Sequence, residues 1–329
     1  MTATSGGKST TSFIWLELTG RCQLNCVHCY ADSGPTQGHG TMATDDWLRI
    51  IDQAAEHGVA MVSMIGGEPT SHPDFADLLE HALAMDLEVE VFTNLFHVAD
   101  RLWTLFSLPG VRLATSYYSD DPVQHDTVTG RPGSYTRTRQ NIAQAVVRRI
   151  PIRVGIIGLA DAQRTDQARR ELEAIGVPAE AIGYDALRAF GRGAQGLPNE
   201  ADTCGKCGHS TAAVLPDGTV APCVFTRTAK AGSVLASPLG DVLSGDQFAE
   251  QVARLDTLRQ RHASMSPCTP NLCNPQCGPT CSPACTPCGP GNCQPTRCAP
   301  QYSCGPCSPQ DRTCSPDNNC RPNQCRPSR

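Results

Sequence analysis

The sequence Cys22-Gln-Leu-Asn-Cys26-Val-His-Cys29-Tyr30 directly follows the strand-like segment 13–18. Three cysteines within eight residues of one loop can bind a single metal centre through their thiolates. A [4Fe–4S] cluster normally takes four cysteines, so a local set of three leaves one iron open to an outside ligand. A structural zinc site or chance are the alternatives, but zinc sites usually pair a Cys-x2-Cys with a second, distant pair.

Outward from this loop, residues 13 to about 190 alternate strand-like and helix-like segments. Six βα units in series predict a parallel sheet with the helices outside. Because six units are too few to close an eight-fold barrel, the expected α/β architecture is a partial (β/α)6 TIM-like barrel. Its chemistry would then sit at the C-terminal ends of the strands. The predicted strands are 13–18, 61–65, 88–93, 112–117, 153–159 and 181–184, and the predicted helices are 47–55, 75–83, 99–108, 134–149 and 165–175.

Charge and hydropathy exclude several classes of protein. The 329 residues carry 27 basic and 32 acidic side chains, a formal net charge of −5. Proteins that bind nucleic acids or membrane surfaces usually carry more basic than acidic side chains, so neither a nucleic acid nor a membrane is expected as a partner. No apolar run reaches the roughly 18 residues of a membrane span. The polar N-terminus lacks the basic region of a secretory signal, so a cytoplasmic protein is expected.

The nineteen cysteines are unevenly placed: six precede residue 264, and the others lie between Cys268 and Cys325. Residues 266–329 offer almost no apolar side chains besides cysteine, so this tail cannot close a hydrophobic core. Three interpretations of the far tail are a disordered metal-scavenging extension, a further metal or cluster site, and a low-complexity extension without a role in turnover. We favour disorder without metal. A disulfide scaffold is disfavoured in a cytosolic protein.

The spacing Cys-x3-Cys-x2-Cys-aromatic after the first strand closely resembles that of the radical S-adenosylmethionine (radical SAM) superfamily. The resemblance implies that Cys22, Cys26 and Cys29 bind a [4Fe–4S] cluster whose open iron is chelated by SAM. Reduction of the cluster would then cleave SAM to methionine and a 5'-deoxyadenosyl radical, which abstracts a hydrogen atom from the substrate. In such an enzyme the cofactors perform the hard chemistry, and the protein supplies position and excludes water.

Further matches to the family follow in the correct order. Gly66-Gly67-Glu68-Pro69 ends the second strand as the family's GGEP segment does, and glycine would let the backbone approach the SAM amino group. Thr93-Asn94 stands where the family often shows Thr-Asn-Gly, with Leu95 in place of that glycine. Ser116 and Gly155 could equally be ordinary packing residues. No catalytic residue beyond the cofactors is identified. The implied cofactor-binding residues are Tyr30, Gly66, Gly67, Glu68, Pro69, Thr93, Asn94, Ser116 and Gly155.

A second group of cysteines follows the predicted barrel. Cys204 and Cys207 precede a predicted hairpin that turns at 216–218, and the hairpin would bring Cys223 back towards Cys207. The run resembles the opening of SPASM or twitch domains, which hold auxiliary [4Fe–4S] clusters; a zinc ribbon is the alternative. At least one auxiliary cluster is expected, and a second stays open because the inner spacings of the tail differ from the SPASM pattern. The implied tail ligands are Cys268, Cys273, Cys277 and Cys281, with Cys285, Cys288, Cys293 and Cys298 as further candidates.

The expected organisation has four parts: a polar segment at 1–12, the radical SAM partial barrel at 13–195, the SPASM/twitch-like domain at 203–290 and a disordered Cys/Pro-rich tail at 291–329. Three functions are compatible with it. We favour modification of a ribosomally made peptide through hydrogen abstraction. Radical oxidation or rearrangement of a small-molecule metabolite is the alternative, and a non-catalytic iron–sulfur or metal-binding protein is the third. About twelve residues precede the first strand, which argues against an N-terminal leader-binding domain. An electron donor such as a flavodoxin or ferredoxin is the expected partner.

Overall fold

The computed structural model describes residues 11–160, 162–194, 200–201 and 203–265, and for 261–265 the backbone alone. The chain divides into two compact units, Met1–Arg254 and Leu255–Arg329. The first unit contains every strand and every site described below. The second contributes to the described residues only the end of one helix.

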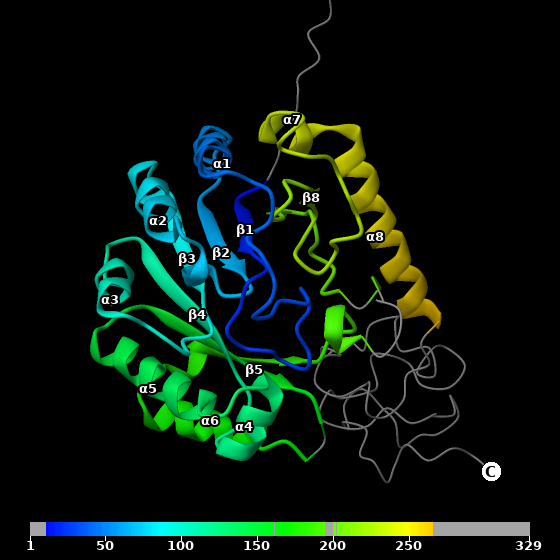
Figure 1. The fold of residues 1–329 in the computed structure, drawn as a ribbon. Helices are drawn as coiled ribbons and strands as arrows, with labels where there is room; N and C mark the ends of the chain where they lie inside the picture. Colours follow the sequence, from blue (N-terminus) through cyan, green and yellow to red (C-terminus); the bar gives the residue numbers. More distant parts are fainter. Residues whose placement is uncertain (1–10, 161, 195–199, 202, 266–329) are drawn as a thin grey trace, which may run out of the picture. The chain divides into compact units, whose positions relative to one another are not determined.

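One eight-stranded sheet forms the centre of the first unit, in the order β6-β5-β4-β3-β2-β1-β7-β8 (Figure 1). All neighbouring strands are parallel except β7 and β8, which are antiparallel. Within the described residues the outer strands β6 and β8 do not pair with each other, so the barrel is open, as the sequence predicted. The strands are β1 (Phe13–Thr19), β2 (Met61–Gly66), β3 (Glu88–Phe92), β4 (Val111–Tyr117), β5 (Ile152–Gly158), β6 (Ile182–Ala186), β7 (Thr211–Val214) and β8 (Val220–Ala221).

The helices that connect β1 to β6 lie on the outer side of the curved sheet (Figure 1). Five of them were predicted; the short α4 was not. The helices are α1 (Thr44–Glu56), α2 (Phe75–Ala84), α3 (Asp100–Phe106), α4 (Pro122–Thr129), α5 (Ser134–Val147), α6 (Thr165–Ala174), α7 (Leu239–Ser244) and α8 (Asp246–Met265). Short 3-10 turns, η1 (Pro69–Ser71), η2 (Ala179–Ala181) and η3 (Gly191–Gly193), complete the described elements.

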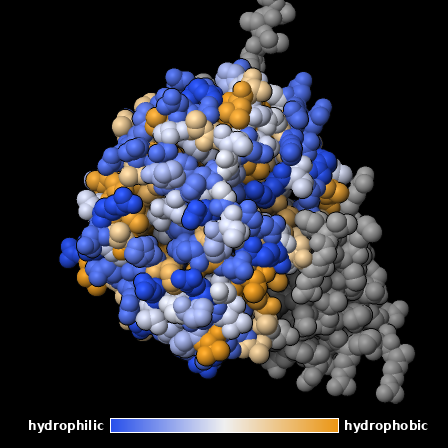
Figure 2. All heavy atoms as spheres, viewed as in Figure 1, coloured by the Kyte–Doolittle hydropathy of each residue, from blue (hydrophilic) through white to orange (hydrophobic). Residues whose placement is uncertain are grey.

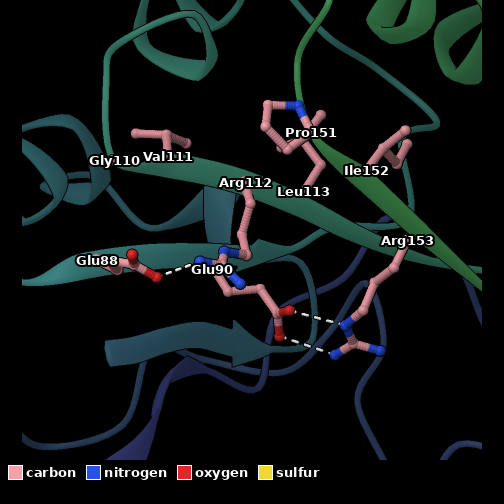
Figure 3. Close-up of a pocket in the computed structure, with 9 residues that line it drawn as sticks. All are labelled: Glu88, Glu90, Gly110, Val111, Arg112, Leu113, Pro151, Ile152 and Arg153. Carbon is pink, nitrogen blue, oxygen red and sulfur yellow. Dashed lines mark hydrogen bonds and ion pairs between the residues drawn. The ribbon is translucent and has the colours of Figure 1, made fainter. Parts of the chain in front are cut away.

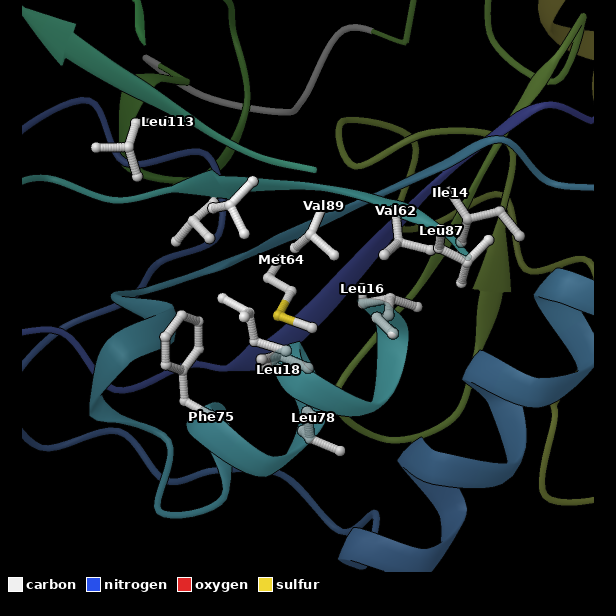
Figure 4. Packing of buried hydrophobic residues seen from close by; sticks show 14 of the residues in the cluster. Ile14, Leu16, Leu18, Val62, Met64, Phe75, Leu78, Leu87, Val89 and Leu113 are labelled. Atoms are coloured by element: carbon white, nitrogen blue, oxygen red, sulfur yellow. The ribbon is translucent and has the colours of Figure 1, made fainter. Parts of the chain in front are cut away.

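The two faces of the sheet are buried differently. Alternate strand residues such as Leu16, Met64 and Val89 are fully buried against the helices, where Phe75 and Leu78 of α2 pack on them (Figure 4). This alternation follows from the two-residue period of a strand. The inner face carries a much smaller apolar cluster around Ile65, Ala213 and Val224, flanked by Trp15, Tyr30, Phe92 and Phe225. The inner face therefore has room for polar side chains, and several are found there.

The hairpin predicted in the cysteine-containing region is confirmed: β7 and β8 are antiparallel and Gly218 occupies the turn with φ +81°. It is also part of the barrel sheet, because Phe13 to Leu16 of β1 pair in parallel with Thr211 to Val214 of β7. The predicted domain boundary near 203 stays a prediction. The boundary at 290 and the tail lie outside the described residues.

The surface visible in Figure 2 is mostly hydrophilic, with apolar side chains in small, separate groups. Large apolar side chains that are exposed include Val27, Val123 and Tyr184. Across the described residues, none of the helices is both long and apolar enough to cross a membrane.

Candidate metal centre

The cysteine loop, residues 20–34, begins where β1 ends, so it lies at the C-terminal edge of the parallel strands. The loop closes on itself through the Cys22 N–H, which donates to the Gly34 carbonyl at 3.1 Å. It is also tied to the end of α4, because the Asn25 N–H donates to the Thr129 carbonyl at 3.0 Å. The loop conformation is thus set mainly by backbone hydrogen bonds, which leaves the three cysteine side chains free of disulfides.

The end of β2 packs directly on this loop. The Gly67 N–H donates to the Thr19 carbonyl at 2.7 Å, and the Glu68 N–H donates to the Arg21 carbonyl at 2.8 Å. A Cβ added to Gly67 would lie 2.2 Å from the Arg21 carbonyl oxygen, and Gly66 has φ +136° with a Cβ position 2.3 Å from the Thr19 oxygen. The close approach that requires glycine here is therefore between two strand ends of the protein. A contact of these glycines with SAM stays a prediction.

Glu68 connects β2 to the end of β3. Its side chain is buried, with 2% of the residue exposed, and one carboxylate oxygen accepts from the Thr70 hydroxyl at 2.7 Å. The other oxygen accepts from the Asn94 N–H at 2.8 Å. Burial raises the pKa of Glu68, and these hydrogen bonds oppose that rise. Through these hydrogen bonds the Glu68 carboxylate connects the end of β2 to the end of β3. Pro69 begins η1 immediately after Glu68.

Asn94 in turn contacts the cysteine loop. Its side-chain Nδ2 donates to the Cys22 sulfur at 3.5 Å, and its Oδ1 accepts from Gln23 Nε2 at 3.1 Å. The Thr93 hydroxyl oxygen accepts from the Leu95 N–H at 3.1 Å. Leu95 is fully buried and adopts φ +53°, the left-handed region where glycine is the usual residue. The backbone geometry expected of Thr-Asn-Gly is therefore kept, although leucine replaces the glycine.

Ser116 and Gly155 are opposite each other in the register of β4 and β5, and their contact with SAM stays a prediction. A Cβ on Gly155 would meet only Ile157 at 3.8 Å and Thr115 at 3.9 Å, so packing alone does not require glycine there. Next to Ser116, the sequence did not single out Tyr118, whose ring stacks edge-on against His28 at 5.0 Å. Burial raises the pKa of Tyr118, and a Ser116 hydrogen bond opposes it.

The donor set fits an iron–sulfur cluster in its chemistry. Burial raises the pKa of Cys22 and that of Cys26 to about 12 each, so both thiols need a compensating positive charge to ionise. A metal centre would supply it, since a coordinating thiol is deprotonated outright. The Leu24 N–H, 3.4 Å from the Cys22 sulfur, is already aimed at this atom. Among the residues that the structure describes, no three side chains converge as a preformed site for a single ion.

Tyr30, the aromatic residue after the third cysteine, packs edge-on against Phe225 with ring centroids 5.2 Å apart. Its hydroxyl is buried, and within the described part of the chain it has no hydrogen-bond partner. Phe225 stacks on Phe190 at 5.3 Å and lies two residues after Cys223. Aromatic side chains thus fill the space between the cysteine loop and the second group of cysteines.

The second group comes together as predicted. The Cys207 and Cys223 sulfurs lie 3.2 Å apart, and both residues are buried. The hydrogen bond from Cys207 lowers the pKa of Cys204 to about 5 and that of Cys223 to about 7, while the pKa of Cys207 itself is raised. The shared proton thus stays on Cys207, and a bound metal would have to displace it for all three sulfurs to act as ligands. The implied ligands Cys268, Cys273, Cys277 and Cys281 lie outside the described residues.

A buried ion pair joins β1 to the segment after β8. Glu17, on the inner face and 1% exposed, pairs with the Arg227 guanidinium. Burial raises the pKa of Glu17 to about 7 despite the opposing charge of Arg227. This pair lies one register position before the end of β1, next to Ile65 of β2.

A cavity of about 510 Å³ opens at the other end of the sheet (Figure 3). Its walls come from the N-terminal ends of β3, β4 and β5, and it contains two ion pairs, Glu88–Arg112 and Glu90–Arg153. Glu90 accepts two hydrogen bonds from Arg153, at 2.7 and 2.8 Å. Because these strand ends are opposite the cysteine loop, this cavity is not part of the candidate metal centre.

Two family models match the chain. Residues 16–168 match the model described as the radical SAM superfamily, and residues 204–278 match the SPASM model, described as an iron–sulfur cluster-binding domain. The second match includes Cys204, Cys207 and Cys223. Together the two models cover the two groups of cysteines whose geometry is described above.

Several curated proteins are similar over parts of their length. A PqqA peptide cyclase of Rhodopseudomonas palustris is 32% identical over 38% of this chain and 33% of its own. The mycofactocin maturase MftC of Mycobacterium tuberculosis is 33% identical over 43% and 36%. An AdoMet-dependent heme synthase of Methanosarcina barkeri is 29% identical over 48% and 47%. The chain thus spans about half or less of the length of these relatives.

Solved structures share the fold at low sequence identity. Streptococcus suis SuiB bound to its precursor peptide SuiA superposes with a TM-score of 0.61 at 15% identity, covering 72% of this chain and 65% of SuiB. A structure of anSMEcpe with bound AdoMet gives a TM-score of 0.59 at 12% identity, covering 75% and 83%. These likenesses show that the open barrel followed by β7 and β8 is a recurring architecture.

Proposed function

We propose that this chain, which matches the radical SAM superfamily over residues 16–168 and the SPASM iron–sulfur cluster-binding domain over residues 204–278, is a radical SAM enzyme that modifies a peptide. The observation that carries the proposal is the cysteine loop. Cys22, Cys26 and Cys29 follow β1 without disulfides, and the ends of β2 and β3 hold the loop through Gly67, Glu68 and Asn94.

In this proposal Cys22, Cys26 and Cys29 would hold the cluster through their thiolates, and the bound cluster and SAM would supply the radical chemistry that removes a hydrogen atom from the substrate. The chain's own residues position the reactants. Ser116 and Gly155 pair in the register of β4 and β5, and a Cβ on Gly155 would make only ordinary contacts, with Ile157 at 3.8 Å and Thr115 at 3.9 Å. The inner-face residues Trp15, Ile65 and Phe92 form an apolar floor that excludes water.

A peptide is the favoured substrate because relatives named as a peptide cyclase and a maturase match this chain at 32% and 33% identity. The fold is also shared with SuiB, whose structure was solved with a precursor peptide. A small-molecule substrate is the second candidate, since a heme synthase is among the relatives at 29% identity. The proposed electron donor is a flavodoxin or a ferredoxin, which would place the protein in the cytoplasm.

Two measurements test the proposal. The full chain, reconstituted with iron and sulfide under anaerobic conditions, is given SAM and a flavodoxin, and 5'-deoxyadenosine is quantified. We expect turnover by the wild type and none when Cys22, Cys26 and Cys29 are all replaced by alanine. A variant with Cys204→Ala is the matched control, because it removes a thiol from the other group and leaves the SAM loop intact.

The substrate class is tested separately. Short peptides encoded next to the gene are co-expressed with the enzyme, and their masses are compared with and without it. A mass change that requires Cys22, Cys26 and Cys29 supports peptide modification. If 5'-deoxyadenosine forms but no neighbouring peptide is altered, the small-molecule alternative is favoured. Retained 5'-deoxyadenosine production in the triple variant would contradict the assignment of the loop.

A further inference from the structure

A short segment after β6 binds the cysteine loop through hydrogen bonds. Its central residue is Arg192, within η3. The Arg192 backbone N–H donates to the Cys29 carbonyl at 3.0 Å. Its side-chain Nε donates to the Cys26 carbonyl at 2.8 Å, and its Nη2 donates to the Ser33 carbonyl at 2.7 Å. One residue therefore engages three carbonyl groups of a loop that precedes it by more than 150 positions.

The glycines on both sides make this contact possible. Gly191 adopts φ +51°, and a Cβ there would lie 2.3 Å from the Cys29 carbonyl oxygen and 2.5 Å from that of Tyr30. A Cβ on Gly193 would lie 2.9 Å from the Arg188 oxygen and 3.2 Å from the His28 oxygen. Because any side chain at these two positions would push the segment away, Gly191-Arg192-Gly193 fits the loop as a unit.

The Arg192 guanidinium group makes its hydrogen bonds with the cysteine loop. Within the described part of the chain its side chain donates only to carbonyl oxygens and forms no ion pair with a carboxylate. The neighbouring Arg188, by contrast, pairs with Asp185 at 2.9 Å. The positive charge of Arg192 is therefore not neutralised by a nearby acid, and it lies against the backbone of Cys26, one of the three cysteines.

We propose that Arg192 is a positioning residue for the SAM-binding cluster, holding two of its cysteines in place and raising its reduction potential through its charge. This inference rests on the proposed function, since it assumes a cluster on Cys22, Cys26 and Cys29. One-electron reduction adds one negative charge to the cluster. A fixed positive charge beside a ligand cysteine stabilises that reduced form, and nearby charge is among the factors that set cluster potentials.

Two substitutions of Arg192 distinguish the effect of its charge on the cluster from the effect of its shape. Arg192→Gln keeps a polar side chain without the charge, and Arg192→Lys keeps the charge with a different shape. Arg164→Gln is the matched control, because Arg164 pairs with Asp120 on the surface at 2.7 Å. Each full-length protein is reconstituted, its iron is counted, and the midpoint potential is measured by a redox titration followed by electron paramagnetic resonance. The signal that SAM perturbs distinguishes this cluster from the auxiliary one.

We expect Arg192→Gln to retain the SAM-perturbed signal with a midpoint potential more negative than that of the wild type. Arg192→Lys should recover most of the difference, and Arg164→Gln should leave the potential unchanged. An unchanged potential in Arg192→Gln at full iron content would overturn the inference. So would equal shifts of the midpoint potential in the Gln and Lys variants, because lysine retains the charge.

The inference and the proposed function fail differently. If the wild type itself gives no SAM-perturbed signal, the proposed function is overturned and the inference falls with it. If the wild type gives the signal and cleaves SAM while Arg192→Gln matches it in potential, only the inference is overturned.

Discussion

The side-chain amide of Asn94 donates to the sulfur of Cys22 across 3.5 Å, although 72 positions separate the two residues. The same side chain accepts from the Phe96 N–H at 2.8 Å, so its orientation is fixed from both ends. The turn after β3 is therefore a partner of the cysteine loop. Hydrogen bonds to cluster sulfurs are one of the means by which proteins set cluster potentials.

The first prediction concerns this amide. Asn94→Asp keeps an oxygen that accepts from Phe96 but replaces the donor to Cys22 with a negatively charged oxygen. We expect a more negative midpoint potential for the SAM-perturbed cluster and weaker retention of iron, because a hydrogen bond worth about 1 kcal/mol becomes a repulsion. Redox titration and iron analysis measure both. Asn141→Asp is the control, since Asn141 donates to the Leu95 carbonyl at 2.7 Å away from the sulfur; an equal shift there would argue against the assignment.

The second prediction concerns the glycine at the end of β2. Gly67→Ala places a Cβ 2.2 Å from the Arg21 oxygen and 2.9 Å from the Gly20 oxygen, both of which are backbone atoms. We expect a loss of about 1–3 kcal/mol in the free energy of unfolding, typical of forced overpacking, before any ligand is added. Urea unfolding of the metal-free protein measures it. Gly183→Ala is the matched control, because no atom lies within 4 Å of its added Cβ.

If Gly67→Ala unfolds like the wild type and only SAM binding suffers, the expectation from the sequence is right and the glycine serves the ligand instead of the loop. Equal losses in Gly67→Ala and Gly183→Ala would point to a general sensitivity of strand glycines.

The third prediction is a dependence of stability on pH that originates in Glu17. Burial raises the pKa of this carboxyl from 4.5 to about 7. Between these values the folded protein holds a proton that the unfolded chain has released, so stability falls as the pH rises. The contribution of Glu17 is fully present below about pH 4.5, and on the order of 3 kcal/mol of it is lost by about pH 7.

Urea unfolding at several pH values measures this slope. In Glu17→Gln the slope should become shallower between about pH 5 and pH 7, since glutamine does not titrate. Glu88→Gln removes a half-exposed carboxylate and serves as the control for the loss of one acid. Parallel curves for the wild type and Glu17→Gln would show that the Arg227 pair keeps Glu17 ionised in the folded protein.

The fourth prediction compares two arginines of the cavity in Figure 3. The Glu90 side chain is 5% exposed, whereas that of Glu88 is 53% exposed. Arg153→Leu leaves Glu90 buried with only the Ser63 hydroxyl as a donor, at 3.1 Å, and should cost about 2 kcal/mol of unfolding free energy. Arg112→Leu should cost less than about 1 kcal/mol, because its partner is hydrated. Guanidinium unfolding measures both, and a larger loss for Arg112→Leu would contradict this ranking.

The sequence predicted what local patterns encode. The six parallel strands with helices between them, the place of the cysteine loop and the hairpin that gathers Cys207 and Cys223 follow from periodicity, spacing and turn residues, and the structure confirms them. The sixth strand differs, because the 3-10 turn η3 follows it instead of a helix. The short helix α4 was missed because Pro122 starts it and Gly130 ends it so closely that no apolar period develops.

The sequence did not predict contacts in which one part of the chain meets backbone atoms of a distant part. Arg192 binds carbonyl oxygens, which every residue carries, so no residue type in the loop reveals its partner. The packing of Gly67 on Arg21 was not predicted for the same reason: a glycine shows that something approaches closely, but the sequence does not show which backbone atoms do so. Tyr118 is not part of any sequence motif, and only its position beside Ser116 and His28 in the structure marks it as a residue of the candidate site.

The position of β1 between β2 and β7 has a consequence for how the protein is made. β1 is synthesised before β7, and one of its two edges finds its partner only when Thr211 to Val214 have been synthesised. Pairings between such distant segments slow folding, and an unpaired strand edge invites association with other chains in the meantime. The nascent chain thus carries an unpaired strand edge close to Cys22 until β7 has been made, so the cysteine loop reaches its final surroundings only after both segments have been synthesised.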